Sequence, residues 1–370
     1  MATFEPAKML RPALLSYDDY ATLDAPEQIA AQYGLAVSDL VRLDANENPY
    51  GPSTKARAAL AGDYAAHRYP DAEQRELRAA LAGWLGVPAS TIVAGAGSDE
   101  MIEAVFRCCI EAGERIVISS PTFGMYSFDA QQYGAEVVDV PRREDWELDR
   151  ESLLAAARDA KAVFLPSPNN PTGNAASREL IEELLETGAL IVIDEAYIEF
   201  SAEESVAPLA AAGAPLVVLR TFSKWGGLAG MRIGYAVMPE ALALATMAVK
   251  QPYSLNVAAE VAALASLQDI EELDERACTI TAERERLLEA LQATGWIEPW
   301  PSDTNFLLCR LLRSDGATVR EALRSRGVII RYFDSDRLRG HIRISVGTAE
   351  DTDRVIEALA EVAQELGAEA

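Results

Sequence analysis

The stretch Leu-Val-Val-Leu-Arg-Thr-Phe-Ser-Lys, residues 216–224, decides the fold, because an apolar run leads directly into a lysine flanked by hydroxyl groups. A short run of valine and leucine that ends in polar residues is typical of a buried strand. Lys224 therefore follows the end of a predicted strand, just behind Thr221 and Ser223. Ligands of open α/β sheets bind at the carboxyl ends of strands, so this is where a functional lysine is expected.

The same pattern recurs outward from this stretch, from about residue 90 to 240. Short apolar runs alternate with segments of helical period, such as 99–111 and 178–186, which is the signature of βαβ units. We therefore expect an α/β fold with a mostly parallel central sheet covered by helices. The predicted strands are residues 91–94, 115–119, 135–140, 162–165, 190–194, 216–222 and 233–237.

The two ends of the chain are typical of a second, smaller α+β unit. Its predicted strands are 304–308, 328–331 and 341–346, and its main helices are 271–294 and a final one from residue 351, after a helical segment at 258–267. We predict a large domain over residues 45–270. The small domain is predicted to consist of residues 1–44, which include an N-terminal arm, and residues 271–370.

Composition excludes several functions. A formal net charge of −25 over 370 residues disfavours nucleic acid and anionic membranes as partners. No stretch has the length of a membrane span and the start does not resemble a secretion signal, so we predict a cytoplasmic protein. Four cysteines without metal-ligand spacing and only two histidines make a disulfide framework, a metal site and a Ser/His/Asp triad unexpected. We expect the cysteines to be buried and reduced.

Lys224 has the local layout of an amine that forms a Schiff base with a phosphorylated aldehyde cofactor. Such an amine must lose its proton near neutral pH, so burial or neighbouring cations must lower its pKa from about 10.4. An isolated Ser-Lys is usually a solvated lysine in a turn. Here the hydroxyls of Thr221 and Ser223 and the guanidinium of Arg232 suit a phosphate dianion, which favours the functional interpretation.

Other strand ends carry residues that suit the same cofactor. Asp194 ends the apolar run Ala-Leu-Ile-Val-Ile-Asp and would keep a pyridine nitrogen protonated, although it could instead cap the next turn. Tyr197 and Asn170 could reach a ring hydroxyl. Phe123, in Pro-Thr-Phe, could stack on a flat heterocycle, although most phenylalanines belong to the core. Together with Lys224, these positions indicate pyridoxal 5′-phosphate.

The segment Gly-Ala-Gly-Ser-Asp-Glu, residues 95–100, connects a predicted strand to a predicted helix. The backbone N–H groups of Gly97, Ser98 and Asp99 would then be available to a phosphate, although an ordinary helix cap has the same pattern. A dinucleotide fingerprint needs glycine where Glu100 stands, so a nicotinamide dehydrogenase is remote.

With these segments in order, the chain resembles the fold type I aminotransferases and, within them, the histidinol-phosphate aminotransferases. The resemblance extends over nearly the whole chain. It implies the fold of a class I/II aminotransferase, pyridoxal 5′-phosphate as cofactor and a homodimer with active sites at its interface. The segments that carry it are Leu-Asp-Ala-Asn-Glu-Asn-Pro-Tyr-Gly (43–51), Arg-Tyr-Pro (68–70), Pro-Thr-Phe-Gly-Met-Tyr (121–126), Ser-Pro-Asn-Asn-Pro-Thr-Gly (167–173), Asp-Glu-Ala-Tyr-Ile-Glu-Phe (194–200) and Arg-Ile-Ser-Val-Gly-Thr (343–348).

The resemblance also implies roles for individual residues. Its catalytic residues would be Lys224, Asp194 and Tyr197. The phosphate would be bound by Gly97, Ser98, Asp99, Thr221, Ser223, Arg232 and, from the neighbouring subunit, Tyr50. The cofactor ring would be held by Phe123, Asn170, Asp194 and Tyr197. Substrate would be bound by Tyr20, Asn170, Arg331 and Arg343.

The implied reaction is the transfer of an amino group from histidinol phosphate to 2-oxoglutarate in histidine biosynthesis, by a ping-pong cycle through pyridoxamine phosphate. The same chemistry on phenylalanine or tyrosine is the alternative, and a non-catalytic cofactor-binding regulator is a remote one. Some positions depart from the family pattern. Asp18, Asp19 and Ala21 surround Tyr20, and Trp225 and Phe123 are expected to change the shape of the pocket.

Overall fold

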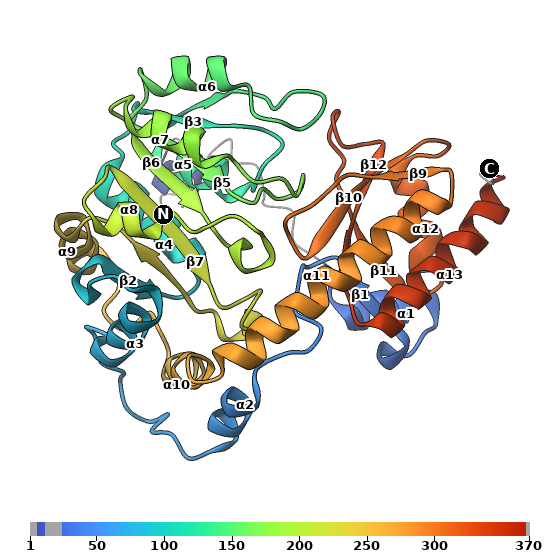
Figure 1. Cartoon of the computed structure of the whole chain (residues 1–370), viewed down its shortest axis with the longest axis horizontal. Coiled ribbons are helices and arrows are strands. Elements are labelled where there is room, and N and C mark those ends of the chain that lie inside the picture. The colour runs from blue at the N-terminus through green and yellow to red at the C-terminus, as the bar shows by residue number, and fades with distance from the viewer. Residues whose placement is uncertain (1–5, 12–23, 368–370) are drawn as a thin grey trace, which may run out of the picture.

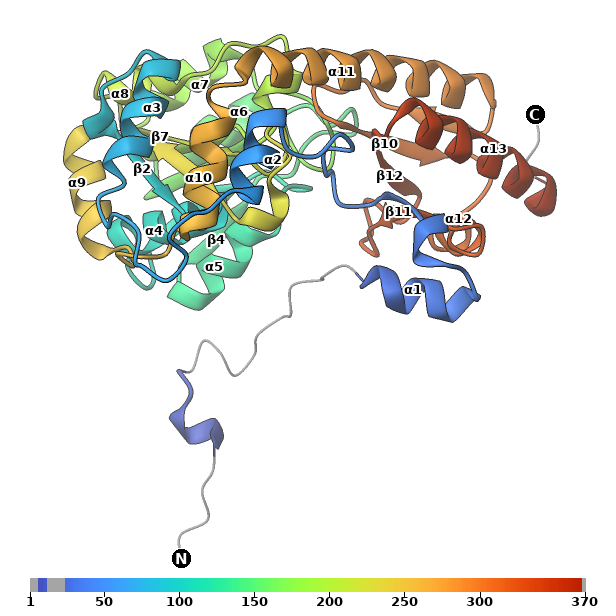
Figure 2. The same cartoon turned by 90° about the horizontal axis from the view of Figure 1, so that it is seen from below.

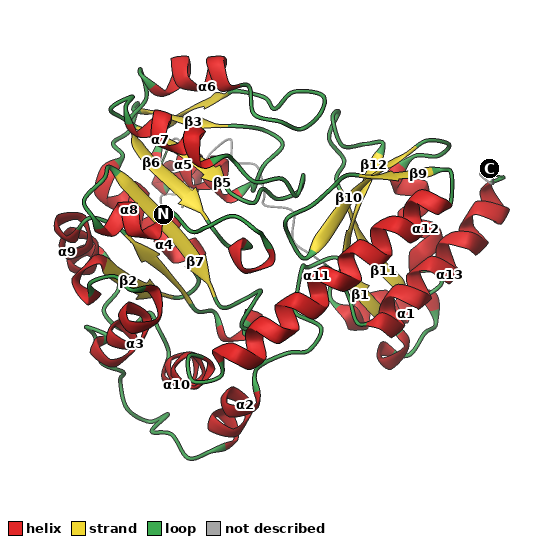
Figure 3. Cartoon of the chain, viewed as in Figure 1, coloured by secondary structure: helices red, strands yellow, loops and turns green. Residues whose placement is uncertain are grey.

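The computed structural model describes residues 6–11 and 24–367 of the chain. Two β-sheets lie in two lobes, and the long helix α11 (Ile270–Ala293) runs from one lobe to the other (Figure 1). The larger lobe holds a seven-stranded sheet and the smaller lobe a five-stranded sheet. Figure 3 shows helices around the strands in both lobes.

The larger sheet confirms the strands predicted for the middle of the chain. Its strand order is β2-β8-β7-β6-β5-β3-β4, and all neighbours are parallel except β8, which is antiparallel to β2 and to β7. Consecutive parallel strands end at one edge, so their following loops meet there. The strands are β2 (Ile92–Gly95), β3 (Arg115–Ile118), β4 (Glu136–Asp139), β5 (Ala162–Pro166), β6 (Leu190–Asp194), β7 (Leu216–Thr221) and β8 (Gly234–Val237).

Both faces of this sheet are buried, which explains the continuous apolar runs. Along β5, Phe164 points into one core while Val163 and Leu165 point into the other. The Phe164 side is covered by α4 (Ser98–Cys109), α5 (Met125–Tyr133) and α9 (Glu240–Val249). The opposite side is covered by α3 (Arg75–Leu85), α6 (Arg150–Ala157), α7 (Arg178–Leu185), α8 (Ala207–Ala211), α10 (Val257–Ser266) and part of α11, and α2 (Thr54–Ala61) packs on α10.

The smaller sheet joins the two ends of the chain, because β1 pairs in parallel with β11 and the remaining pairs are antiparallel. The order is β1 (Val41–Leu43), β11 (Val328–Tyr332), β12 (His341–Ser345), β10 (Phe306–Leu311) and β9 (Ile297–Pro299). The three strands predicted for the smaller unit correspond to β10, β11 and β12, and are confirmed. The three-residue strands β1 and β9 were too short to show a pattern.

Helices α11, α12 (Gly316–Arg324) and α13 (Ala349–Leu366) share the core of the smaller sheet. Helix α1 (Pro26–Tyr33) lies beside α12 (Figure 2), where the Tyr33 hydroxyl donates to Glu321. Short 3₁₀ turns are η1 (Pro6–Met9), η3 (Val37–Asp39), η4 (Ala89–Thr91), η5 (Ile198–Phe200) and η6 (Ala229–Met231).

None of the helices in residues 6–11 and 24–367 combines the length and the apolar character that crossing a membrane requires. The four cysteines are all unpaired, as predicted. The prediction that all of them are buried holds only for Cys309: Cys108 and Cys109 are half-buried, and Cys278 is exposed on α11.

Candidate functional site

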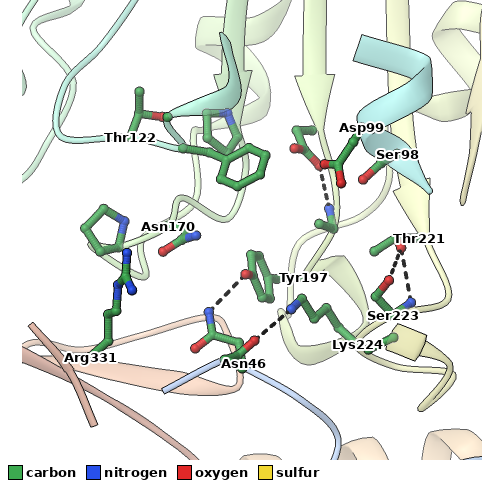
Figure 4. A pocket seen from close by; sticks show the side chains of 18 of the residues that line it. Asn46, Ser98, Asp99, Thr122, Asn170, Tyr197, Thr221, Ser223, Lys224 and Arg331 are labelled. Carbon is green, nitrogen blue, oxygen red and sulfur yellow. Dashed lines mark hydrogen bonds between the residues drawn. The ribbon is translucent and has the colours of Figure 1, made fainter. Parts of the chain in front are cut away.

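A cavity of about 770 Å³ lies where the carboxyl ends of the parallel strands meet the smaller sheet (Figure 4). It receives residues from the ends of β5, β6 and β7 and from β11 and β12. Twelve of the predicted site residues line it: Ser98, Asp99, Phe123, Asn170, Asp194, Tyr197, Thr221, Ser223, Lys224, Arg232, Arg331 and Arg343. The predicted convergence of these strand ends on one pocket is confirmed.

The amine of Lys224 lies inside this cavity. Its Nζ donates to the backbone carbonyl of Ala45 at 3.0 Å and lies 5.9 Å from the ring centre of Tyr197. The pKa of this amine is lowered to about 8, mainly by burial and also by the positive charge of Arg343, while the carboxylate of Glu47 acts in the opposite direction. The lowered pKa required of a Schiff-base lysine is therefore present.

Asp194, at the end of β6, is buried and accepts two hydrogen bonds. Its Oδ2 accepts from the hydroxyl of Tyr126 at 2.9 Å and its Oδ1 from the N–H of Ala196 at 3.1 Å. Burial raises the pKa of the carboxyl to about 6, and these two donors keep it from rising further. The sequence analysis missed Tyr126, although it lies in the quoted segment 121–126.

Three successive residues after β1, Asp44 to Asn46, each accept from or donate to one of the predicted site side chains. The carbonyl of Asp44 accepts from Nη2 of Arg343 at 2.6 Å, and the carbonyl of Ala45 accepts from Lys224. The side-chain Nδ2 of Asn46 donates to the hydroxyl of Tyr197 at 3.0 Å (Figure 4). Two of these three contacts use the backbone, which sequence reasoning cannot detect.

Helix α4 begins at the cavity as predicted, but its entry differs in detail. Gly97 is the residue before the helix and has a φ of +88°, and its N–H already donates to the carbonyl of Gly95 at 2.8 Å. The first-turn N–H groups of Ser98 and Asp99 are therefore the donors that face an anion here. The carboxylate of Asp99 forms a 2.8 Å ion pair with Arg232, so this guanidinium is held at the helix start.

The hydroxyls of Thr221 and Ser223 are buried beside this helix start. The Thr221 hydroxyl donates to Oγ of Ser223 at 2.9 Å, and the N–H of Ser223 donates to Oγ1 of Thr221 at 3.1 Å. Both side chains line the cavity together with Ser98 (Figure 4). Hydroxyls, helix N–H groups and one guanidinium together suit a phosphate.

Arg331 and Arg343 occupy facing positions of the antiparallel strands β11 and β12, so their side chains leave the same face of the sheet. Nη1 of Arg343 donates to Oδ1 of Asn170 at 2.6 Å. The Phe333 ring, missed from the sequence, lies 5.3 Å from the guanidinium carbon of Arg331 and 5.6 Å from that of Arg343. Like charges in facing positions repel, which an anionic substrate would relieve.

Some predicted positions lie elsewhere. Trp225 does not line the cavity: it is 1% exposed, stacks on Trp84 at 5.0 Å between ring centroids, and donates its Nε1–H to Asp274. The prediction that it reshapes the pocket is wrong, because it points into the core. Tyr50 does not line the cavity of its own chain. Tyr20 and its neighbours Asp18, Asp19 and Ala21 lie outside the described residues.

The donor set fits a phosphorylated pyridine aldehyde. The amine of Lys224 suits an aldehyde, the buried carboxylate of Asp194 suits a protonated ring nitrogen, and the helix start at Ser98 suits a phosphate. Phe123 lines the same cavity and its ring meets that of Tyr126 edge-on at 5.7 Å.

Comparison with known proteins agrees with this geometry. The family model "Aminotransferase class I and II" matches residues 38–359. A histidinol-phosphate aminotransferase of Roseiflexus castenholzii is 48% identical over 365 residues, which cover 96% of this chain and 98% of that protein. A chloroplastic histidinol-phosphate aminotransferase of Nicotiana tabacum is 41% identical, over 95% of this chain and 86% of that protein.

A solved structure extends the comparison to three dimensions. The histidinol-phosphate aminotransferase of Sinorhizobium meliloti, determined in complex with pyridoxal 5′-phosphate, superimposes with a TM-score of 0.87. It is 30% identical in sequence, and the match covers 99% of both chains. The similarity therefore includes both lobes and the residues between them.

Proposed function

This chain belongs to the class I and II aminotransferases, and we propose that it uses pyridoxal 5′-phosphate to transfer an amino group from histidinol phosphate to 2-oxoglutarate. The observation that carries the proposal is one cavity that holds the Lys224 amine, the buried Asp194 carboxylate and the facing pair Arg331 and Arg343. The named relatives favour histidinol phosphate over an aromatic amino acid as donor.

When bound, the cofactor supplies an electron sink for the bonds at the substrate's Cα. The Asp194 carboxylate would accept from a protonated ring nitrogen, and Tyr197 and Asn170 would hold the ring oxygen. Lys224 would hold the aldehyde group through Nζ and would serve as the base for the Cα proton, because an amine with a pKa of about 8 is an effective base near neutral pH. Phe123 would pack against the ring.

The two arginines form one binding site that can hold either a phosphate or a carboxylate. A planar guanidinium binds phosphate and carboxylate in the same bidentate way, so Arg331 and Arg343 serve histidinol phosphate in one half-reaction and 2-oxoglutarate in the other. The start of α4, with Thr221, Ser223 and Arg232, would bind the phosphate of the cofactor.

The experiment is a comparison of amino donors. Purified protein loaded with pyridoxal 5′-phosphate is assayed with histidinol phosphate, phenylalanine and tyrosine, each with 2-oxoglutarate as acceptor. We expect the highest kcat/KM for histidinol phosphate. A higher kcat/KM for phenylalanine would show that histidinol phosphate is not the preferred amino donor. If glutamate did not convert the bound cofactor in a half-transamination, followed by its absorbance, the proposed aminotransferase activity would be refuted.

We further propose a homodimer in which Tyr50 completes the neighbour's phosphate site. The support is that Tyr50 lies outside the cavity of its own chain while its motif, residues 43–51, borders that cavity. Mixing the inactive variants Tyr50→Ala and Lys224→Ala should restore activity, since a hybrid dimer contains one intact site. Activity of the mixture no higher than that of the separate variants would refute a shared site.

Three coarser expectations remain proposals. They are the division into a large domain at 45–270 and a small domain at 1–44 and 271–370, a cytoplasmic location, and the lack of nucleic-acid or membrane partners, which the net charge of −25 supports.

A further inference from the structure

Asn46 is a buried polar residue in an unusual backbone conformation. It lies in the quoted segment 43–51 but received no role from the sequence. Its side chain and backbone are 1% exposed, and its φ is +54°, in the left-handed region that asparagine enters more readily than other residues with a side chain. A conformation of this kind persists only where the surroundings hold it in place.

Four hydrogen bonds provide that support. The N–H of Asn46 donates to Oγ of Ser345 at 2.9 Å, and the Ser345 hydroxyl donates back to Oδ1 of Asn46 at 2.8 Å. Nδ2 of Asn305 donates to the Asn46 carbonyl at 3.0 Å. The remaining bond leaves this cluster: Nδ2 of Asn46 donates to the hydroxyl oxygen of Tyr197 at 3.0 Å. Asn46 thus joins the smaller sheet to a residue of the larger lobe.

The orientation of the Asn46 amide follows from its neighbour. Ser345 is 2% exposed, and its hydroxyl oxygen already accepts from the Asn46 N–H. If the amide were turned over, the Ser345 hydroxyl would lose Oδ1 of Asn46, the one acceptor to which it donates among the described residues. A buried donor without a partner is destabilising, so the amide keeps Oδ1 toward Ser345 and Nδ2 toward Tyr197.

We infer that Asn46 is a positioning residue for Tyr197. Because its Nδ2 donates to the Tyr197 oxygen, the phenolic hydrogen of Tyr197 points away from Asn46 and toward the bound cofactor. The Tyr197 ring cannot tilt freely to restore another arrangement. It packs nearly perpendicular to the Phe306 ring, at 5.3 Å between centroids and 86° between planes, and Lys224 lies over its face. Tyr197 is 6% exposed. The inference rests on the cofactor of the proposed function.

The test measures cofactor binding to apoprotein, by titration with pyridoxal 5′-phosphate followed through quenching of tryptophan fluorescence. Asn46→Gly keeps the backbone conformation, since glycine adopts positive φ without strain, and removes only the side chain. Loss of one net hydrogen bond should raise the Kd by about threefold to tenfold. Asn46→Asp replaces the donor with an acceptor of the same size, which turns the Tyr197 hydrogen away from the cofactor, so its Kd should be at least as high as that of Tyr197→Phe.

The decisive comparison is a double-mutant cycle. If Asn46 acts through Tyr197, then Asn46→Gly combined with Tyr197→Phe should bind the cofactor no more weakly than Tyr197→Phe alone. Gln74→Gly is the matched control, because Gln74 is also a buried amide at a φ of +54°, and it accepts from the N–H of Ala94 outside the cavity. It should lower the melting temperature without changing the Kd.

The outcomes separate this inference from the proposed function. Fully additive effects of Asn46→Gly and Tyr197→Phe, or an unchanged Kd in Asn46→Gly, would overturn the positioning role. Circular dichroism and the melting temperature of each apoprotein show whether a variant has folded, and Asn46→Asp preserves the test if the glycine variant does not fold. If the wild-type protein itself fails to bind the cofactor, that result would refute the proposed function.

Discussion

The hydrogen bond from Tyr126 to Asp194 should control the pH range in which the cofactor binds. We predict that Tyr126→Phe raises the pKa of Asp194, because the variant removes the donor that lies 2.9 Å from Oδ2 and leaves the N–H of Ala196 as the other protein donor. Tyr126 is fully buried, and its ring packs on Phe164 at 5.5 Å, so phenylalanine keeps the packing and loses only the hydroxyl.

The size of the effect can be worked out from this geometry. Hydrogen bonds to charged groups contribute about 1.5–3 kcal/mol, and one pKa unit corresponds to about 1.36 kcal/mol, so the pKa of Asp194 should rise by about one to two units. The carboxyl of the wild-type apoprotein, with a pKa of about 6, is mostly ionised at neutral pH. In the variant about half to nine-tenths of the carboxyl would be protonated at pH 7, which weakens cofactor binding at that pH by about twofold to tenfold.

The sign follows from linkage. Burial raises the folded pKa of Asp194 above its ordinary value of 3.8, so this group destabilises the folded apoprotein progressively as pH rises from about 4 through about 6. A cationic ring nitrogen bound beside the carboxylate offsets that cost above pH 6. The cofactor should therefore raise the melting temperature more at pH 8 than at pH 5, and Tyr126→Phe should shift this transition to higher pH.

The assay is a set of titrations of apoprotein with pyridoxal 5′-phosphate from about pH 5.5 to about pH 8.5. The matched control is Tyr133→Phe, which removes a hydroxyl from the same helix, α5, where Tyr133 donates to Glu103 at 3.0 Å outside the cavity. The control should reproduce the wild-type curve. A Tyr126→Phe curve that superimposes on the wild type would refute the assigned role of this hydrogen bond.

Four further predictions concern the same site. Lys224→Ala should abolish transamination while the protein remains folded, and near-normal turnover of this variant would contradict the mechanism. In wild-type apoprotein, the rate at which borohydride traps pyridoxal 5′-phosphate on Lys224 should rise with pH up to about 8 and then level off, because only the neutral amine reacts. A rate that still rises steeply up to about pH 10 would indicate a lysine with an ordinary pKa. Arg331→Ala should raise the KM for histidinol phosphate by tenfold or more, on the scale of one lost charged hydrogen bond, and lower kcat/KM for glutamate less; equal losses would argue against a phosphate contact. Gly97→Ala should weaken cofactor binding and lower stability by about 1 kcal/mol or more, since the φ of Gly97 is +88° and an added Cβ would lie 2.7 Å from Arg232. Gly83→Ala, at an open position in the last turn of α3, should instead stabilise the protein by about 0.5–1 kcal/mol. A stabilised Gly97→Ala would contradict the strain argument.

The sequence by itself determined the large sheet, the residues at its strand ends that line one cavity, and the family. Buried parallel strands need continuous apolar runs, and the residue that ends each run is placed at one edge of the sheet, so Asp194 and Lys224 could be assigned to one pocket from the chain alone. The segments that carry the resemblance are short and contiguous, so they too are readable without coordinates.

Only the tertiary structure decided how these side chains are held. The contacts of Asp44, Ala45 and Asn46 join residues that are 299, 179 and 151 positions apart, and two of them use backbone carbonyls, which have no sequence signature. Trp225 follows Lys224 directly, yet its side chain points into the core and not into the cavity, because it stacks on Trp84. Local sequence sets where a strand begins and ends, whereas hydrogen-bond partners distant along the chain are chosen only once the two sheets have packed together.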